Sequence, residues 1–266
     1  DCQNLVKSMF ADKEFSNQIN MSGVNSINWA RIIAQSVYYF YCYFLAEDDN
    51  QPINFSVPTG NFGDVYAGYL AKKLGLPINK LIVATNQNDI LHRAISKGKY
   101  EAEHVSETIS PSMDIQIASN FERLIYDLNS HDSSQTLDDM KNIKQNGKYT
   151  IDDEKLKKIN QDFLSARMSE QETLDVIKNI YEKFNMVLDP HTAIGYGAFD
   201  KHDLKGNNIV LATAHPCKFP DAILKAINLK SDLPDELKFI LDEKENYGII
   251  ENSFKEIKQY ILGKIK

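Results

Sequence analysis

The sequence has few cysteines and no long apolar run. Its three cysteines, Cys2, Cys42 and Cys217, are an odd number, lie far apart and form no C-x-x-C pair. We therefore predict neither a disulfide framework nor a zinc knuckle, and a reducing cytoplasm fits best. The longest strongly apolar stretch, residues 36–46, contains four tyrosines. It is shorter than the roughly 20 residues of a membrane-spanning helix, so no transmembrane segment is predicted.

The charge balance and several missing motifs exclude further classes. The 266 residues include 30 Lys+Arg and 37 Asp+Glu, a formal net charge of −7, which argues against nucleic acid or an anionic membrane as a partner. The histidines lack H-x-x-x-H and H-E-x-x-H spacing, so no metal site is predicted. A P-loop, a G-x-G-x-x-G fingerprint and a G-x-S-x-G elbow are also missing. No targeting segment is recognisable, and a start at Asp1 instead of Met leads us to expect further chain before it.

The apolar pattern predicts an α/β fold with a parallel sheet flanked by helices. Strands are expected at residues 53–57, 81–85 and 209–213, with helices between them. A long helix before the first strand is expected to pack through one apolar face, formed by Ile27, Ala30, Ala34, Val37, Tyr41 and Phe44. Residues 110–185 show helical spacing without a strand. We therefore divide the chain into an α/β part (1–109), a mainly helical insertion (110–185), a returning α/β part (186–228) and a helical tail (229–266).

Two strand ends carry candidate binding groups. The loop Gly60–Asp64 follows the first strand and precedes a helix that we expect Asp64 to cap and Gly75 to end. Backbone N–H groups of such a loop can converge on a phosphate at the helix N-terminus. The same pattern also fits a tight turn whose glycines only permit positive φ. Thr213 ends the third strand, where open α/β sheets place ligands, although a threonine there can simply bond its own backbone.

A later helix offers a weaker candidate. Asn120 and Arg123 are three residues apart, opposite the apolar stripe of their helix, and together could bind an anion. A solvated helix face is the favoured explanation of the pair.

Six ordered strings resemble threonine synthase. They are NSINWAR (25–31), VPTGNFGD (57–64), SPSMD (110–114), SNFER (119–123), DPHTAIG (189–195) and TAHPCKFP (213–220). Threonine synthases are pyridoxal 5′-phosphate (PLP) enzymes of fold type II, the tryptophan-synthase-β type. They convert O-phospho-L-homoserine and water into L-threonine and phosphate. The resemblance thus implies that fold, that cofactor and that small-molecule substrate.

The resemblance also implies roles for individual residues. Cofactor binding is implied for the loop and for the third strand end, at Gly60, Asn61, Phe62, Gly63, Asp64 and Thr213. Thr213 would reach the pyridine nitrogen. Weaker predictions for the carboxylate or phosphate of the substrate are Asn25, Ser26, Asn28, Ser119, Asn120 and Arg123.

One departure from the family limits the predicted activity. The family's Schiff-base lysine lies in a Phe-Lys-Asp segment, and neither this segment nor its Gly-Asp-Thr-Gly loop occurs here. The catalytic nucleophile is therefore unknown, and we interpret the chain as an incomplete C-terminal portion, inactive alone, that needs the N-terminal portion. Alternatives are another PLP-dependent lyase or dehydratase of the same fold, a non-catalytic module for phosphorylated metabolites, and a structural fragment paired with a separately encoded N-terminal part. The strands would lack an outer partner where that portion belongs, so exposed apolar surface is expected along that edge of the sheet.

Overall fold

The computed structural model describes residues 2–25, 27–46 and 51–265. It contains two compact units. The larger comprises Trp29–Asp232, and the smaller joins Asp1–Asn28 to Leu233–Lys266. The predicted α/β part, residues 1–109, included residues 1–28, which lie in the smaller unit.

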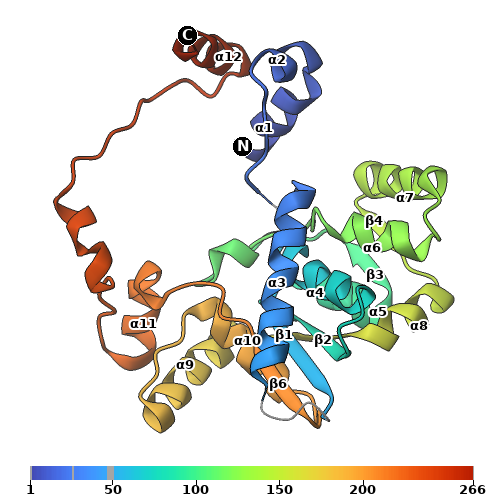
Figure 1. Ribbon diagram of the computed structural model, residues 1–266, viewed down its shortest axis with the longest axis vertical. Coiled ribbons are helices and arrows are strands. Elements are labelled where there is room, and N and C mark those ends of the chain that lie inside the picture. Colours follow the sequence, from blue (N-terminus) through green and yellow to red (C-terminus); the bar gives the residue numbers. More distant parts are fainter. Residues whose placement is uncertain (1, 26, 47–50, 266) are drawn as a thin grey trace. The chain divides into compact units, whose positions relative to one another are not determined.

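The larger unit is built on a four-stranded parallel sheet (Figure 1). Its strands, in spatial order, are β5 (Phe163–Arg167), β2 (Ile78–Thr85), β1 (Ile53–Pro58) and β6 (Asn207–Val210). Every residue of β1 is buried, as expected for a strand covered on both faces. The predicted parallel α/β fold is thus confirmed, with β1 and β2 in their predicted places.

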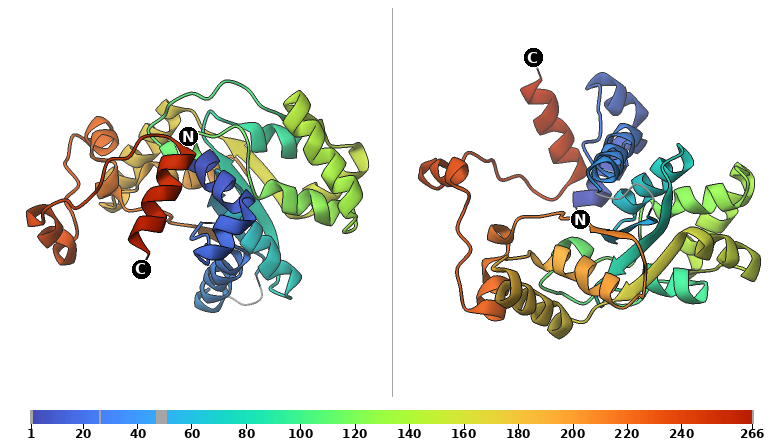
Figure 2. Two further views of the ribbon diagram at one scale, coloured as in Figure 1. Left: turned by 90° about the horizontal axis from the view of Figure 1, so that it is seen from above. Right: turned by 60° about the horizontal axis from the view of Figure 1, so that its bottom comes forward.

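Helices cover both faces of this sheet (Figure 2). Alternate strand residues separate the two cores: Phe55 and Leu81 pack on one face, whereas Ile82 packs on the other. The first face is covered by α3 (Trp29–Leu45), α4 (Gly63–Lys73), α5 (Ile90–Lys97) and α8 (Asp153–Asp162). The second face is covered by α10 (Pro190–Asp200), which packs on α9 (Glu170–Phe184) and through it on α11 (Pro220–Ile227).

Helix α3 forms where predicted but buries a different face. Its buried residues are Ile32, Ser36 and Tyr39, whereas Val37 and Phe44 of the predicted face are 60% and 76% exposed. The helix is apolar nearly all round, so its periodicity does not select a face. The buried face of α3 is determined by Gly68 of α4. A side chain at Gly68 would occupy the space of the Tyr39 ring, so only glycine lets Tyr39 pack there. The exposed side of α3 therefore carries large apolar side chains, among them Val37, Tyr41 and Phe44.

The segment 110–185 is mainly helical but supplies a strand of the main sheet. It contains η1 (Pro111–Met113), α6 (Phe121–Leu128) and α7 (Ser133–Asn146) before α8 and α9. The expectation of no strand is wrong at β5, which pairs with β2 from Leu81↔Phe163 to Thr85↔Arg167. A separate two-stranded antiparallel sheet pairs β3 (Lys99–Glu101) with β4 (Lys148–Thr150). The third predicted strand is also displaced, because β6 begins at Asn207 and ends before Thr213.

The smaller unit is helical. It contains α1 (Cys2–Ala11), α2 (Lys13–Gln18), η3 (Asp235–Asp242) and α12 (Phe254–Lys264). An ion pair of 2.6 Å between Lys258 Nζ and Asp12 Oδ2 joins α12 to the start of α2, where Phe15 is fully buried. None of the helices in the described ranges is both long and apolar enough to cross a membrane.

Candidate functional site

The strand order creates one switch point at the carboxyl edge of the sheet. From β1 the chain moves to β2 and then to β5, but β6 returns on the opposite side of β1. The loop after β1 leads to α4 on the first face, whereas the chain after β6 leads to α11 on the side of α10. Adjacent strands whose connections leave in opposite directions form a switch point, where open α/β sheets bind ligands. The ends of β1 and β6 therefore define the candidate site.

The predicted glycine loop occupies this position. Thr59 N–H bonds the carbonyl of Ala84, which holds the end of β1 against β2. Gly60 follows, and a Cβ atom placed on it would lie 2.6 Å from the carbonyl oxygen of Ser112. Glycine is therefore required here for close backbone approach. Asn61 then closes a local turn, with its Oδ1 accepting a hydrogen bond of 3.1 Å from Gly63 N–H.

The loop leaves backbone donors free at the start of α4. Within the described part of the chain, the N–H groups of Phe62, Asp64 and Val65 have no hydrogen-bond acceptor. The helix dipole adds partial positive charge at this end. The predicted N-cap at Asp64 is wrong: the N-cap is Phe62, in the left-handed conformation with φ of 68°. This donor set suits a phosphate group, as the pattern suggested.

Phe62 is positioned differently from the rest of the loop. Its ring is fully buried between Phe121 and Phe163, at centroid distances of 5.2 and 5.7 Å. The side chain therefore anchors the loop to the core, and its backbone is what the loop presents.

Asp64 points its carboxyl group toward α3. The Tyr39 hydroxyl donates to the backbone oxygen of Asp64 at 2.8 Å and to its Oδ1 at 3.2 Å. Burial raises the pKa of Asp64 from 3.8 to about 6, and the Tyr39 hydrogen bond lowers it only in part. The Asp64 side chain thus joins α4 to α3, while the backbone N–H of Asp64 is one of the free donors of the glycine loop.

This raised pKa gives a testable pH dependence. The folded protein holds the Asp64 proton up to about pH 6, whereas the unfolded chain releases it near 3.8, so stability falls as pH rises through that window. We expect Asp64→Asn to remove this slope and to raise the free energy of unfolding at pH 8 by on the order of 2 kcal/mol. Urea unfolding from pH 4 to 8 measures it, with the exposed Asp138→Asn as control. Parallel profiles for wild type and Asp64→Asn would contradict the assignment.

Thr213 lies just beyond the neighbouring strand end. Leu211 N–H still bonds the Ser56 carbonyl at 3.0 Å, which continues the β1–β6 pairing past Val210. Thr213 follows two residues later and its side chain is exposed. The prediction that Thr213 ends the strand is wrong, because β6 ends at Val210, and its role in cofactor binding stays a prediction.

The SNFER string contacts the glycine loop directly. Asn120 donates its backbone N–H to the Asn61 carbonyl at 3.0 Å, and its Nδ2 donates to the same oxygen at 3.3 Å. Its Oδ1 accepts from Arg123 Nε at 2.9 Å, and the Arg123 guanidinium lies 5.2 Å from the Trp29 ring centroid. Asn120 is 1% exposed, which leaves its side chain committed to the protein, whereas Ser119 is exposed.

The predicted substrate residues near the N-terminus belong to the smaller unit. Asn25 accepts from Ile27 N–H at 3.1 Å, and Asn28 Nδ2 donates to the Gly23 carbonyl at 2.9 Å. Ser26 lies outside the described residues. These contacts are local to that unit.

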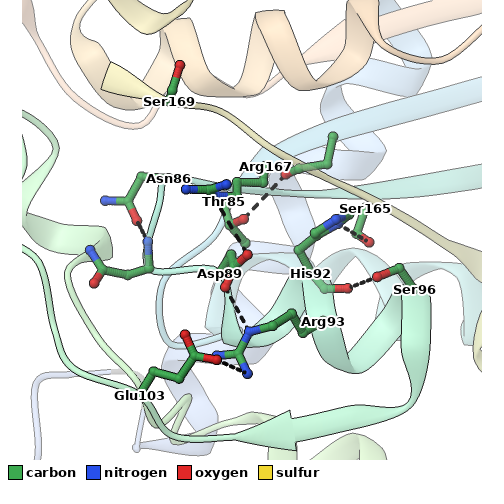
Figure 3. Close-up of polar contacts among 12 residues, drawn as sticks. Thr85, Asn86, Asp89, His92, Arg93, Ser96, Glu103, Ser165, Arg167 and Ser169 are labelled. Atoms are coloured by element: carbon green, nitrogen blue, oxygen red, sulfur yellow. Dashed lines mark hydrogen bonds and ion pairs between the residues drawn. The ribbon is translucent and has the colours of Figure 1, made fainter. Parts of the chain in front are cut away.

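A charged cluster that was not predicted lies at the same edge, after β2 and at the end of β5 (Figure 3). Asp89 accepts a hydrogen bond of 2.8 Å from Arg93 Nε, and Arg167 Nε lies 3.7 Å from its other oxygen. Arg93 also reaches Glu103 at 3.1 Å. Arg167 is half exposed and carries positive charge at the ligand edge. It was missed because β5 was not predicted.

The DPHTAIG string forms the start of α10. Asp189 caps this helix and accepts from the backbone N–H and the Nδ1 of His191, at 2.9 and 3.0 Å. His191 is 4% exposed, and its ring packs 4.9 Å from the Phe219 ring. Gly195 approaches the ends of both β1 and β6, since a Cβ there would lie 3.1 Å from Pro58 and 3.0 Å from Val210. The motif therefore supports the switch point from the second face.

Comparison with known proteins agrees with this geometry. The family described as threonine synthase, C-terminal, matches residues 192–261. Threonine synthase of Saccharomyces cerevisiae is 44% identical over 286 residues, covering 97% of this chain and 55% of that protein. A PLP-bound threonine synthase from Brucella melitensis has a TM-score of 0.92 and 45% identity, covering 98% of this chain and 56% of that one. Over nearly its whole length, the chain is therefore similar to one part of known threonine synthases.

Two further threonine synthases are also matched over only part of their length. The yeast crystal structure matches with a TM-score of 0.87 and 41% identity over 99% of this chain and 57% of that one. The Pseudomonas aeruginosa threonine synthase is 40% identical, with 98% and 56% covered. The chain thus spans about half the length of the relatives it matches.

Proposed function

We propose that this chain supplies the cofactor-phosphate half of a PLP-dependent threonine synthase site, which converts O-phospho-L-homoserine and water into L-threonine and phosphate. The observation that carries the proposal is the free donor set of the glycine loop at the β1–β6 switch point, in a chain similar to threonine synthase over nearly its whole length. PLP, when bound, supplies an electron sink for the substrate's carbon skeleton. The Brucella relative is PLP-bound.

Different residues of the chain are proposed to bind the cofactor and the substrate. The N–H groups of Phe62, Asp64 and Val65 would hold the phosphate of the cofactor, and the Thr213 hydroxyl would interact with its pyridine nitrogen. Arg123 and Ser119 are proposed for the substrate oxyanions, and Asn25, Ser26 and Asn28 remain predictions for the same task. The Schiff-base lysine is proposed to come from the portion of the enzyme that corresponds to the other half of its relatives. The cytoplasm is proposed as compartment because Cys42 and Cys217 carry free thiols.

A binding experiment on the purified chain tests this division. Pyridoxine 5′-phosphate lacks the aldehyde that reacts with lysines, so its fluorescence titration reports non-covalent binding alone. We expect it to bind at least tenfold more tightly than pyridoxine, about 1.4 kcal/mol, because the loop recognises the phosphate. Equal binding of both compounds would overturn the loop assignment.

Activity measurements test the missing lysine. The purified chain with PLP and O-phospho-L-homoserine is expected to release neither threonine nor phosphate above background. Borohydride reduction followed by peptide mapping is expected to find no single modified lysine. Turnover, or stoichiometric modification of one lysine, would show that the chain carries its own nucleophile.

A further inference from the structure

Two motifs outside the glycine loop converge on it from different sides. The turn 110–114 lies against Gly60, where the Ser112 carbonyl and the Met113 Cα leave no room for a side chain. The segment 118–121 bonds the next residue, because both nitrogen donors of Asn120 meet the Asn61 carbonyl. The loop that carries the free N–H groups is therefore held at two consecutive residues.

The first support is a compact hydrogen-bond network. Asp114 Oδ1 accepts from Asn86 Nδ2 at 2.7 Å, from Asn88 Nδ2 at 2.9 Å and from the Thr108 hydroxyl at 2.7 Å. Its Oδ2 accepts from Thr108 N–H at 2.8 Å. Asn86 and Asn88 directly follow β2, so one carboxylate fastens the turn to the strand beside β1. A carboxylate can accept all four bonds, which an amide cannot.

The second support is anchored in the core. Ala118 N–H donates to the Tyr100 hydroxyl at 2.8 Å, and the Phe121 ring stacks on the Tyr100 ring at 5.0 Å. Phe121 in turn contacts the buried Phe62 ring. The segment that presents Asn120 is thus fixed before it meets the loop.

We propose that Asn120 and Asp114 are positioning residues that hold the glycine loop in its phosphate-binding conformation. The inference rests on the proposed function for its ligand. The support that Asn120 and Asp114 give to the glycine loop, called the brace below, is a property of the loop itself. Both residues act through the loop and neither touches the phosphate. Asn120, predicted from sequence as a substrate ligand, is reassigned to this role because its amide is buried and already bonded at both ends.

The sharpest test of the brace is Asn120→Asp. The variant keeps the shape of the side chain and an oxygen for Arg123, and aspartate caps a helix as well as asparagine does. It replaces the Nδ2 donor by an oxygen 3.3 Å from the Asn61 carbonyl, which turns an attraction into a repulsion. Asp114→Asn tests the turn 110–114. It replaces one carboxylate oxygen by an NH₂ group, which then faces the N–H and O–H donors that the carboxylate had bound.

Hydrogen exchange and ligand titration provide the two measurements. We expect amide exchange of residues 60–65 to accelerate at least tenfold in both variants, and pyridoxine 5′-phosphate to bind at least tenfold more weakly, while each variant remains folded. Asn146→Asp, at the exposed end of α7, adds the same charge away from the loop and is expected to change neither quantity.

The outcomes separate the brace from the proposed function. If the wild type fails to discriminate pyridoxine 5′-phosphate from pyridoxine, the proposed function fails, and exchange at residues 60–65 still decides the brace. If one variant does not fold, the other decides it by the same two measurements. Unchanged exchange in a folded variant would overturn the brace. Faster exchange without loss of affinity would overturn its role in binding.

Discussion

Replacing Gly60 by alanine is expected to weaken pyridoxine 5′-phosphate binding by at least tenfold and to destabilise the larger unit by about 1–3 kcal/mol. The added Cβ would lie 2.6 Å from the Ser112 carbonyl oxygen and 3.4 Å from the Met113 Cα, which are backbone atoms. Backbone cannot rotate away as the end of a flexible side chain can. Either the turn 110–114 or the glycine loop must shift, and the Asp114 network resists the first movement.

The shift is expected to appear in binding more than in stability. Moving the loop redirects the N–H groups of Asp64 and Val65, whose directions decide how well they meet a phosphate. Titration and urea unfolding of the same variant separate the two effects. Gly263→Ala is the matched control, because a Cβ there meets nothing within 4 Å and alanine favours the helix. Wild-type affinity in Gly60→Ala would mean that the close approach of the two backbones is irrelevant to the ligand.

The parts of the fold that could be predicted are those specified by local pattern. The unit from β1 through the glycine loop to α4 was recognisable because a buried apolar run, a glycine loop and a stop at Gly75 follow one another. Strand β5 carries no such signal. Its sequence mixes Ser165 and Arg167 with apolar residues, and as an edge strand it is only partly buried, so it needs no continuous apolar run. Its place is set by pairing with β2.

Strand β6 shows a second reason for failure. Its first half is polar, and amide pairs hold it in register: Asn54 Nδ2 donates to Asn208 Oδ1, and Asn79 Nδ2 donates to Asn54 Oδ1, both at 2.8 Å. These three asparagines lie on three different strands. Sequence patterns that describe one strand at a time contain no information about such a ladder, so the apolar run from Ile209 was taken for the whole strand.

In the candidate site, too, the features set by local sequence could be predicted, and those set by distant contacts could not. The phosphate-binding property of the loop depends on backbone N–H groups at a helix start, which glycine spacing can indicate. The burial of Phe62 and the internal use of Asn120 depend on contacts with α6 and β5, which are distant in sequence. A polar residue beside a candidate site has the same sequence signature whether it binds the ligand or supports the loop that does.

Removing the Asp189 carboxylate is expected to have the largest effect on stability. Asp189→Ala is expected to cost about 3–5 kcal/mol, because it leaves a buried histidine without its partner and exposes orphan donors at the start of α10. Asp189 is 1% exposed and accepts from His191 N–H, His191 Nδ1 and the Thr192 hydroxyl. Asp152→Ala is the matched control. It also removes a helix cap, at the start of α8, but from an exposed position, and is expected to cost about 1 kcal/mol.

The same substitution connects stability to the site. The His191 ring packs against Phe219, at the end of the segment that carries Thr213, and Gly195 packs between Pro58 and Val210 at the switch point. Loosening the start of α10 should therefore weaken pyridoxine 5′-phosphate binding even where the protein remains folded. Because a loss of 3–5 kcal/mol is a large share of the stability of a typical domain, Asp189→Asn, which keeps one acceptor oxygen, provides the measurable intermediate. Equal urea midpoints for Asp189→Ala and Asp152→Ala would show that the buried pair adds nothing beyond a helix cap.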